Sequence, residues 1–202
     1  MTTPLQADVA RAVPWSVRTV DRTEAERLAR FAAIVFRQAY GVTHPEPVLS
    51  DYLAKAFSVT RMAQAIADPA SAMLVIESTE GVWAGYAELH EGAPVAPGTV
   101  LDLPLPGAAP LEIVRFYVDA QWHGRGVAQT LMQSCPAVAR ERGCDVLWLQ
   151  AWQEAGQAVR FYRKAGFTMH GTAVFMFGER ADADFILARP VDALPDSPAA
   201  VG

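Results

Sequence analysis

A glycine-containing loop lies between an apolar run and an amphipathic stretch in the middle of the chain. The run Leu111–Val118, LEIVRFYV, predicts a strand, and a helical pattern extends from about Gly126 to Arg142. Between them lies His-Gly-Arg-Gly-Val-Ala at residues 123–128. The first N–H groups of a helix have no intrahelical partner and carry the positive end of the helix dipole, and glycines allow an anion to approach closely. The arrangement therefore predicts a cradle for a phosphate or pyrophosphate group.

Two nucleotide-binding loops of similar shape are excluded by the residues themselves. A Walker-type loop requires Gly-Lys-Ser/Thr, whereas this chain has Gly126-Val127-Ala128. A dinucleotide fingerprint requires a third glycine at the position that Gln129 occupies. The alternative that stays open from the loop alone is a tight turn that binds nothing.

Carboxylates on half-buried strands are the next candidates for chemistry. Glu112 and Glu88 alternate with apolar neighbours, a setting that raises the pKa of a carboxyl group and suits a general base. His90 is a further candidate base. An ion pair with Arg115 or another arginine is the competing interpretation for each glutamate.

Metal, thiol and serine-hydrolase chemistry have little support in the sequence. Cys135 and Cys144 form no Cys-x-x-Cys pair, and the four histidines show no ligand spacing. We therefore expect two reduced, buried thiols and no metal site. A Gly-x-Ser-x-Gly sequence is absent as well.

Length and composition predict one folded domain over residues 15–190. The chain has 202 residues, 51% hydrophobic and 19% charged, and Pro/Ala-rich ends at 1–14 and 191–202 that we expect to be mobile. The net charge of −5 and the lack of a basic cluster disfavour a nucleic-acid partner. No apolar stretch approaches the roughly 18–20 residues that span a bilayer, and no signal-peptide pattern is present. We expect a cytoplasmic protein without a membrane partner.

The periodicity of apolar residues predicts an α/β fold of the α+β kind, in the order β-α-α-β-β-β-α-β-α-β-β. A capping box at Thr23 and Glu26 should open the first helix, and Ser58 is a candidate N-cap within 48–67, which holds one or two helices. Further helices are expected at about 126–142 and 157–165. The predicted strands are Ser16–Val20, Met73–Glu77, Val82–His90, Leu111–Val118, Asp145–Trp152, Thr168–Phe177 and Asp184–Ala188.

Two features depart from this regular pattern. Glu91–Pro110 contains five prolines and three glycines, so it is expected to be a long loop, either a flap beside the substrate or a disordered segment. Pro136 lies inside a predicted helix and should kink it.

Two segments together resemble the signatures of the GNAT superfamily of N-acetyltransferases. The loop at 123–128 is similar to the family's acetyl-coenzyme A loop, Gln/Arg-x-x-Gly-x-Gly/Ala, with His123 in place of Gln/Arg. Phe161–Phe167, FYRKAGF, resembles the second signature, a helix ending in Phe-Tyr-x-x-x-Gly-Phe. Phe175–Arg189 looks most like the branch of polyamine (spermidine/spermine-type) N-acetyltransferases. The resemblance implies a mixed, mostly antiparallel, twisted sheet of six to seven strands, split between strands 4 and 5 and flanked by about four helices.

The same resemblance implies acetyl transfer from acetyl-coenzyme A to a primary amine of a small, polyamine-like molecule by direct attack. Tyr162 lies where the family keeps a tyrosine that protonates the leaving thiolate, and Glu112 is the candidate base. The pantetheine arm would pair with backbone groups of Phe116, Tyr117 and Val118. The pyrophosphate would lie at the loop formed by His123, Gly124, Arg125, Gly126, Val127 and Ala128.

The sequence departs from the family pattern at two positions, which leaves alternatives open. Gln150 stands where many relatives carry a glutamate base, and Ala155 stands where many carry an asparagine that contacts the cofactor. The base is therefore Glu112, Glu88, His90 or a water-mediated route. A non-catalytic acyl-coenzyme A module, acetylation of a protein N-terminus or lysine, and an unrelated phosphate-binding domain are the competing functions, and a homodimer stays open.

Aromatic residues offer a further interpretation. Trp148 and Trp152 share parity on a predicted strand and, with Trp83 and Trp122, could form a cage for a cation. Packing in the hydrophobic core is the alternative for all four.

Overall fold

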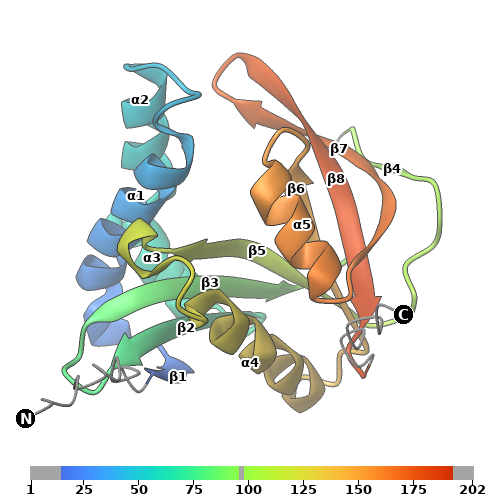
Figure 1. Ribbon diagram of the computed structural model, residues 1–202, viewed down its shortest axis with the longest axis horizontal. Coiled ribbons are helices and arrows are strands. Elements are labelled where there is room, and N and C mark those ends of the chain that lie inside the picture. The colour runs from blue at the N-terminus through green and yellow to red at the C-terminus, as the bar shows by residue number, and fades with distance from the viewer. Residues whose placement is uncertain (1–14, 96–97, 193–202) are drawn as a thin grey trace, which may run out of the picture.

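The computed structural model describes residues 15–95 and 98–192, and their strands form one eight-stranded sheet (Figure 1). The strand order is β1-β2-β3-β5-β6-β8-β7-β4, and every neighbouring pair is antiparallel except β5 and β6. Of the ends at 1–14 and 191–202 that we expected to be mobile, residues 1–14 and 193–202 lie outside the described residues, whereas Val191 is buried. The strands are β1 Trp15–Thr19, β2 Ser71–Ser78, β3 Trp83–Glu91, β4 Val100–Leu101, β5 Pro110–Val118, β6 Val146–Trp152, β7 Thr168–Phe177 and β8 Arg180–Pro190.

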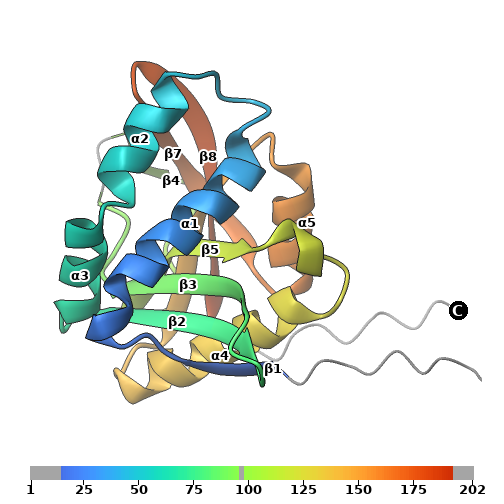
Figure 2. The ribbon, with the colours of Figure 1, turned by 90° about the vertical axis from the view of Figure 1, so that its left-hand side faces the viewer.

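The helices of the described part of the chain lie on both faces of this sheet. One core cluster joins α1, α2 and α3 to β2 and β3, and another joins α4 and α5 to the opposite face. In Figure 2, α1 crosses in front of β2, β3 and β5. No helix in the described ranges is long and apolar enough to cross a membrane. The helices are α1 Ala25–Tyr40, α2 Val48–Ala56, α3 Val59–Ala67, α4 Val127–Glu141 and α5 Gly156–Lys164, with 3-10 turns at Arg22–Glu24 and Ala120–Trp122.

The predicted fold class is confirmed, with a small error in the number of elements. The expectation of six to seven strands is wrong by one, because β4 is a two-residue strand inside the Pro/Gly-rich segment 91–110. Such a strand has no alternating pattern to detect; it forms by pairing with the edge of β7. Of the one or two helices expected within 48–67 there are two, because Ser58 accepts a hydrogen bond from the N–H of Arg61 and so starts α3 separately from α2, which makes five helices instead of about four.

The start of α1 also differs from the prediction. The capping box is formed by Asp21 and Glu24, two residues before the expected Thr23 and Glu26. The Asp21 side chain accepts from the N–H of Thr23, and Glu24 accepts from the N–H of Asp21. A 3-10 turn therefore precedes α1, and Glu26 faces solvent on its first turn.

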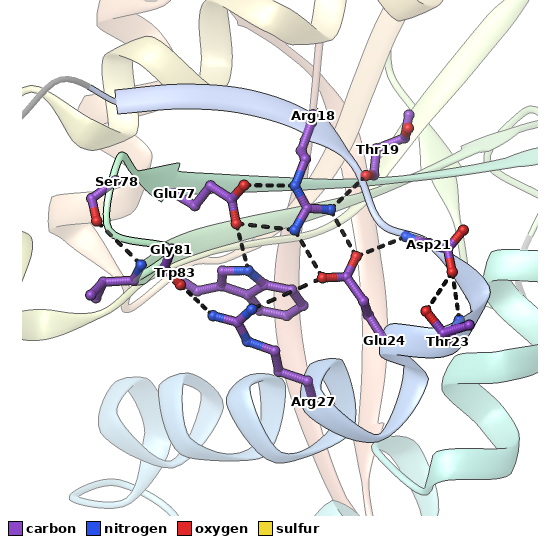
Figure 3. A network of polar contacts seen from close by, with 11 residues as sticks. Arg18, Thr19, Asp21, Thr23, Glu24, Arg27, Glu77, Ser78, Gly81 and Trp83 are labelled. Atoms are coloured by element: carbon purple, nitrogen blue, oxygen red, sulfur yellow. Dashed lines mark hydrogen bonds and ion pairs between the residues drawn. The ribbon is translucent and has the colours of Figure 1, made fainter.

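Arg18 joins the edge of the sheet to the start of α1 (Figure 3). Its guanidinium donates to Glu77 of β2 at 2.7 Å and to Glu24 at 2.7 Å. Glu77 also accepts from the indole N–H of Trp83, over whose ring Arg27 of α1 lies at 4.2 Å. These contacts hold the N-terminal end of α1 against the sheet, which in turn fixes where the other end of α1 reaches.

The split in the sheet lies where the resemblance implied it, between the fourth and fifth predicted strands. β5 and β6 pair only over Pro110–Glu112, opposite Val146–Trp148. Beyond that point the two strands diverge, while β5 stays paired with β3 and β6 with β8. The diverging strands leave one edge of β5 open between the two halves of the sheet.

The segment 91–110 is partly ordered where the structure describes it. Besides forming β4, it places Leu105 against the core cluster between β6 and β8. The Asp145 carboxylate accepts hydrogen bonds from the N–H groups of Ala108 and Ala109. These described residues lie against the sheet instead of forming a flap over the cavity described below.

Candidate functional site

The loop between β5 and α4 has the conformation that the sequence predicted. Gly124 and Gly126 have φ values of +74° and +80°, which side chains other than glycine adopt only with strain. A Cβ atom added at either glycine would meet no atom within 4 Å, so the space in front of both is open. Among the described residues, the backbone N–H groups from Gly124 to Ala128 have no recorded hydrogen-bond acceptor. These N–H groups, at the N-terminus of a helix of 15 residues, fit a bound anion.

His123 has a different contact from the one that the sequence suggested. Its Nε2 lies 3.0 Å from the carbonyl oxygen of Val118, so the ring ties the loop back to the end of β5. The Arg125 guanidinium lies 5.4 Å from the centre of the Trp122 ring. Nδ1 is therefore the ring nitrogen of His123 that remains for contact with an anion. The histidine, which stands in place of the family's Gln/Arg, mainly holds the loop in its conformation.

A bulge in β5 decides which of its side chains face each side of the sheet. The register with β3 shifts at Val114, which has no opposite residue. Residues packed against the α4 side therefore have odd numbers before the bulge and even numbers after it, as Ile113 and Phe116 show. On the other face, the bulge brings together four side chains that line one cavity: Glu112, Val114, Arg115 and Tyr117.

This cavity, of about 180 Å³, lies between the diverging halves of the sheet. Residues of α1, α2 and their connection form one wall of the cavity, and residues of β6, β7 and β8 form another. Aromatic and acidic side chains predominate. Besides the four residues of β5, the lining consists of Phe36, Tyr40, His44, Tyr52, Gln150, Trp152, Phe175, Phe177, Asp182 and Asp184.

Glu112 lines the cavity at the last pair of the β5–β6 ladder, with no ion-pair partner within the described ranges. Burial raises the pKa of Glu112 to about 7, and the nearby Glu88 carboxylate adds to the rise, whereas His90 and Arg115 oppose it. A carboxyl group with a pKa near neutrality, facing a cavity, suits proton abstraction from a bound amine.

The side chains of the other two candidate bases already contact charged groups. Glu88 is buried and forms ion pairs with Arg115 and, at 3.7 Å, with Arg61, so the competing ion-pair interpretation holds for Glu88. His90 lies 3.4 Å from Asp68, and its side chain is 43% exposed. Glu112 therefore differs from Glu88 and His90 in having no charged partner among the described residues, a difference that the sequence alone could not show.

Tyr162 lies on α5, on the side of β5 that faces α4. Its ring contacts Phe116 and Phe167, with ring centres 6.2 and 6.0 Å away. Burial raises the pKa of Tyr162 well above its ordinary value, so its hydroxyl keeps its proton at neutral pH. The described lining of the cavity does not include it. Tyr162 and Glu112 therefore approach β5 from different sides.

The proposed aromatic cage is not formed by the four tryptophans. Only Trp152 lines the cavity. Trp83 and Trp148 belong to core clusters, as the alternative proposed, and Trp122 packs edge-on against Trp15. The cavity takes most of its aromatic surface from Tyr40, Tyr52 and phenylalanines instead.

The departures at positions 150 and 155 differ in their consequences. Gln150 lines the cavity, so a residue that cannot abstract a proton stands in the place of the family's glutamate. Ala155 takes the N-cap position of α5 and provides no side-chain cap. Of the other residues noted in the sequence, Pro136 is buried within α4, and both cysteines are free and buried.

Sequence reasoning missed His44, Asp182 and Asp184. His44 follows α1 and Asp182 lies on β8, 138 residues away, yet His44 Nε2 lies 3.0 Å from Asp182 Oδ2. Arg180 also donates to Asp182 at 2.6 Å and to the carbonyl oxygen of Thr43 at 3.2 Å. The available signal was the alternation Ala-Asp-Ala-Asp at 181–184, which places both aspartates on one face of a strand.

Comparison with known proteins agrees with this geometry. Residues 35–167 match the family model described as the acetyltransferase (GNAT) family. The chain is 29% identical over 167 residues to uncharacterised N-acetyltransferases of Mycobacterium bovis and Mycobacterium tuberculosis, covering 83% of this chain and 97% of theirs. It is 28% identical over 180 residues to an uncharacterised N-acetyltransferase of Lactobacillus delbrueckii subsp. lactis, covering 86% of this chain and 96% of that protein.

Solved structures with the same fold include two in complex with coenzyme A. The PaiA N-acetyltransferase of Thermoplasma acidophilum superposes with a TM-score of 0.68 at 16% identity, covering 88% of this chain and 99% of that one. The spermidine N-acetyltransferase of Vibrio cholerae, in complex with coenzyme A and spermine, gives a TM-score of 0.58 at 17% identity, covering 87% and 95%. At these identities the likeness shows the fold.

Proposed function

The chain belongs to the GNAT family of acetyltransferases, and from this premise we propose that it acetylates a primary amine of a small, polyamine-like cation. The family provides the reaction, acetyl transfer from acetyl-coenzyme A, whereas the acceptor has to be argued from the cavity. The single observation that supports a cationic acceptor is the lining of the cavity in the split, which combines aromatic side chains with carboxylates. Carboxylates and aromatic rings both attract ammonium groups.

The β5–α4 region is the proposed site of acetyl-coenzyme A. The backbone N–H groups from Gly124 to Ala128 would hold the pyrophosphate. The open edge of β5 at Phe116, Tyr117 and Val118 would pair with the amides of the pantetheine arm, because an exposed strand edge offers N–H and C=O groups at regular spacing. Both assignments are supported by open space at the glycines and by the divergence of β6 from β5.

Replacement of Gly126 by alanine is expected to raise the Kd of acetyl-coenzyme A about 10-fold, since the φ of +80° costs an alanine roughly 1–2 kcal/mol and loss of the conformation moves the N–H groups. Calorimetric titration with acetyl-coenzyme A measures this. Gly81→Ala is the matched control: Gly81 has a φ of +75°, open space around its Cβ position and a place in the β2–β3 turn. If both variants bind acetyl-coenzyme A equally well, the loop does not hold it.

The proposed chemistry divides the proton transfers between the two sides of β5. Glu112 takes a proton from the acceptor ammonium, and the freed amine nitrogen attacks the acetyl carbonyl carbon. As the carbon–sulfur bond breaks, the Tyr162 hydroxyl gives its proton to the leaving sulfur. The second proton lost by the nitrogen returns to Tyr162 through solvent. The products are the N-acetylated amine and the free thiol of coenzyme A, with one proton released overall.

The acceptor is tested by measuring thiol release from acetyl-coenzyme A with a panel of amines. The panel contains diamines and polyamines, an aminoglycoside, amino acids and a peptide with a free N-terminus. We expect the highest kcat/KM with polycationic amines that lack a carboxylate, because the cavity already contains unpaired negative charge. Clear binding of acetyl-coenzyme A without thiol release for any amine would favour the alternative, a non-catalytic acyl-coenzyme A module.

A further inference from the structure

Asp184 is a buried carboxylate that lies away from the β5–β6 ladder, at a level four residues further along β6 than the last ladder pair. It lies on β8, is 7% exposed and lines the cavity. No side-chain hydrogen bond or ion pair to this carboxylate is recorded within residues 15–95 and 98–192. Burying a carboxylate without a partner is costly, and a cation placed beside it removes that cost.

The cationic side chains near Asp184 are already engaged. Arg180 and His44 both contact Asp182, the neighbouring aspartate on the same face of β8. Arg115, across the cavity, forms its ion pair with Glu88. Within the described lining, Asp184 is left as the acidic group at this end without a cationic partner.

Aromatic rings surround the same position. Trp152 of β6 is the residue directly opposite Asp184 in the β6–β8 register. The centre of the Tyr40 ring lies 6.1 Å from that of Trp152, and the His44 ring lies 5.7 Å from it. The Arg180 guanidinium lies 5.8 Å from the centre of the Trp152 ring, so this ring already has one cation–π contact. A carboxylate beside these rings favours an ammonium group at the same place.

The register of the sheet separates Asp184 from Glu112. Glu112 lies opposite Trp148 of β6, and Asp184 lies opposite Trp152. Four residues along a strand span about 13 Å, and the two strands that flank β6 are about 10 Å apart, so the two Cα atoms are roughly 16 Å apart. Both side chains line the same cavity. One amine cannot contact both groups, whereas the two ends of one chain can.

We propose that Asp184, with Trp152 and Tyr40, binds a second ammonium group of the acceptor while its first amine reacts beside Glu112. The acceptor is then a linear di- or polyamine held at both ends, and the distance between its nitrogens determines how well it fits. This inference rests on the proposed function, since it assigns the reacting amine to the Glu112 end of the cavity.

The test compares α,ω-diaminoalkanes of increasing length with n-alkylamines of the same length. In the wild type, KM should fall with chain length for the diamines to an optimum about 10-fold or more below that of the matched monoamine. Asp184→Asn should raise KM for the best diamine by about 10- to 100-fold, leaving KM for the monoamine within about 2-fold. Asp51→Asn, which removes an exposed carboxylate from α2, is the control and should leave both constants unchanged.

A second readout keeps the inference separate from the proposed reaction. Calorimetric titration of diamines and monoamines, with coenzyme A present, measures the Asp184 subsite even if no amine is acetylated. Loss of the diamine preference in Asp184→Asn supports the inference in either assay. Equal affinity for diamine and monoamine in the wild type, or the same loss for both in the variant, overturns it. Unchanged monoamine binding by Asp184→Asn also shows that the variant is folded.

Discussion

Replacing Glu112 by glutamine is expected to lower kcat/KM for the amine acceptor by about 10²- to 10⁴-fold, the usual contribution of a general base. Glu112 lines the cavity without an ion-pair partner in the described part of the chain, and burial raises its pKa to about 7. Glutamine keeps the shape and the hydrogen-bonding capacity of the side chain and removes only the ability to accept a proton. The steady-state rate of thiol release measures the loss.

The pH dependence of the same variant identifies the group. In the wild type, kcat/KM should rise with pH through about 7 as Glu112 becomes ionised, and this limb should be absent in the variant. Glu141→Gln, a change at an exposed glutamate near the end of α4, should leave rate and profile unaltered. A variant that retained the limb near pH 7 would show that another group, or water, takes the proton.

The stability of Glu112→Gln should vary with pH in a defined direction. Because the folded protein raises the pKa of Glu112 from 4.5 to about 7, this carboxyl favours folding fully below pH 4.5. Its contribution is lost as pH rises through 7. The variant has no charge to bury, so its melting temperature relative to the wild type should be higher at pH 8 than at pH 5. This control separates a lost base from a damaged fold.

Tyr162→Phe is expected to lower kcat by about 10²-fold with little change in KM, because the hydroxyl acts on the sulfur only as the carbon–sulfur bond breaks. Because burial raises the pKa of Tyr162, its hydroxyl is protonated when the thiolate leaves. An acetyl thioester whose thiol is more acidic needs less protonation, so it should restore much of the lost rate. A packing defect would not be relieved by a more acidic thiol, so the recovered rate distinguishes a lost acid from a damaged core.

Tyr86→Phe is the matched control for Tyr162→Phe. Tyr86 is fully buried, and its hydroxyl has no hydrogen-bond partner among the described residues, so the substitution removes the same atom from another buried ring. We expect its kcat to equal that of the wild type. Equal rates for Tyr162→Phe and the wild type would contradict the acid role and leave Tyr162 as a core residue beside Phe116.

The β5–α4 loop could be predicted because its signals are local. The end of an apolar run, two glycines and the start of a helical period all fall within a short segment, and the backbone there follows those residues. The match to FYRKAGF then identified the family. By contrast, β4 has two residues and forms only because the edge of β7 is available for pairing, which no local pattern reveals.

The cavity beside β5 could be predicted only in part, since it is assembled from distant segments. Glu112 was a candidate on its strand, but the sequence could not decide between it and Glu88, because the deciding ion pairs come from Arg115 and Arg61. The bulge at Val114 reverses the alternation within one strand, so parity alone assigns the wrong face to the residues after it. His44 and Asp182 meet only through the tertiary fold.

The contact between His44 and Asp182 connects two walls of the cavity, the segment after α1 and strand β8. The β6–β8 half of the sheet is joined to β5 by the short β5–β6 ladder and to the connection after α1 by this contact, with the bond from Arg180 to Thr43 beside it. Walls that are connected at one place can separate by rotating about it, whereas walls connected at two places separate only when one of the contacts breaks. Widening the cavity on this side would therefore break a buried hydrogen bond, which favours a thin, flexible chain over a bulky molecule as the proposed acceptor.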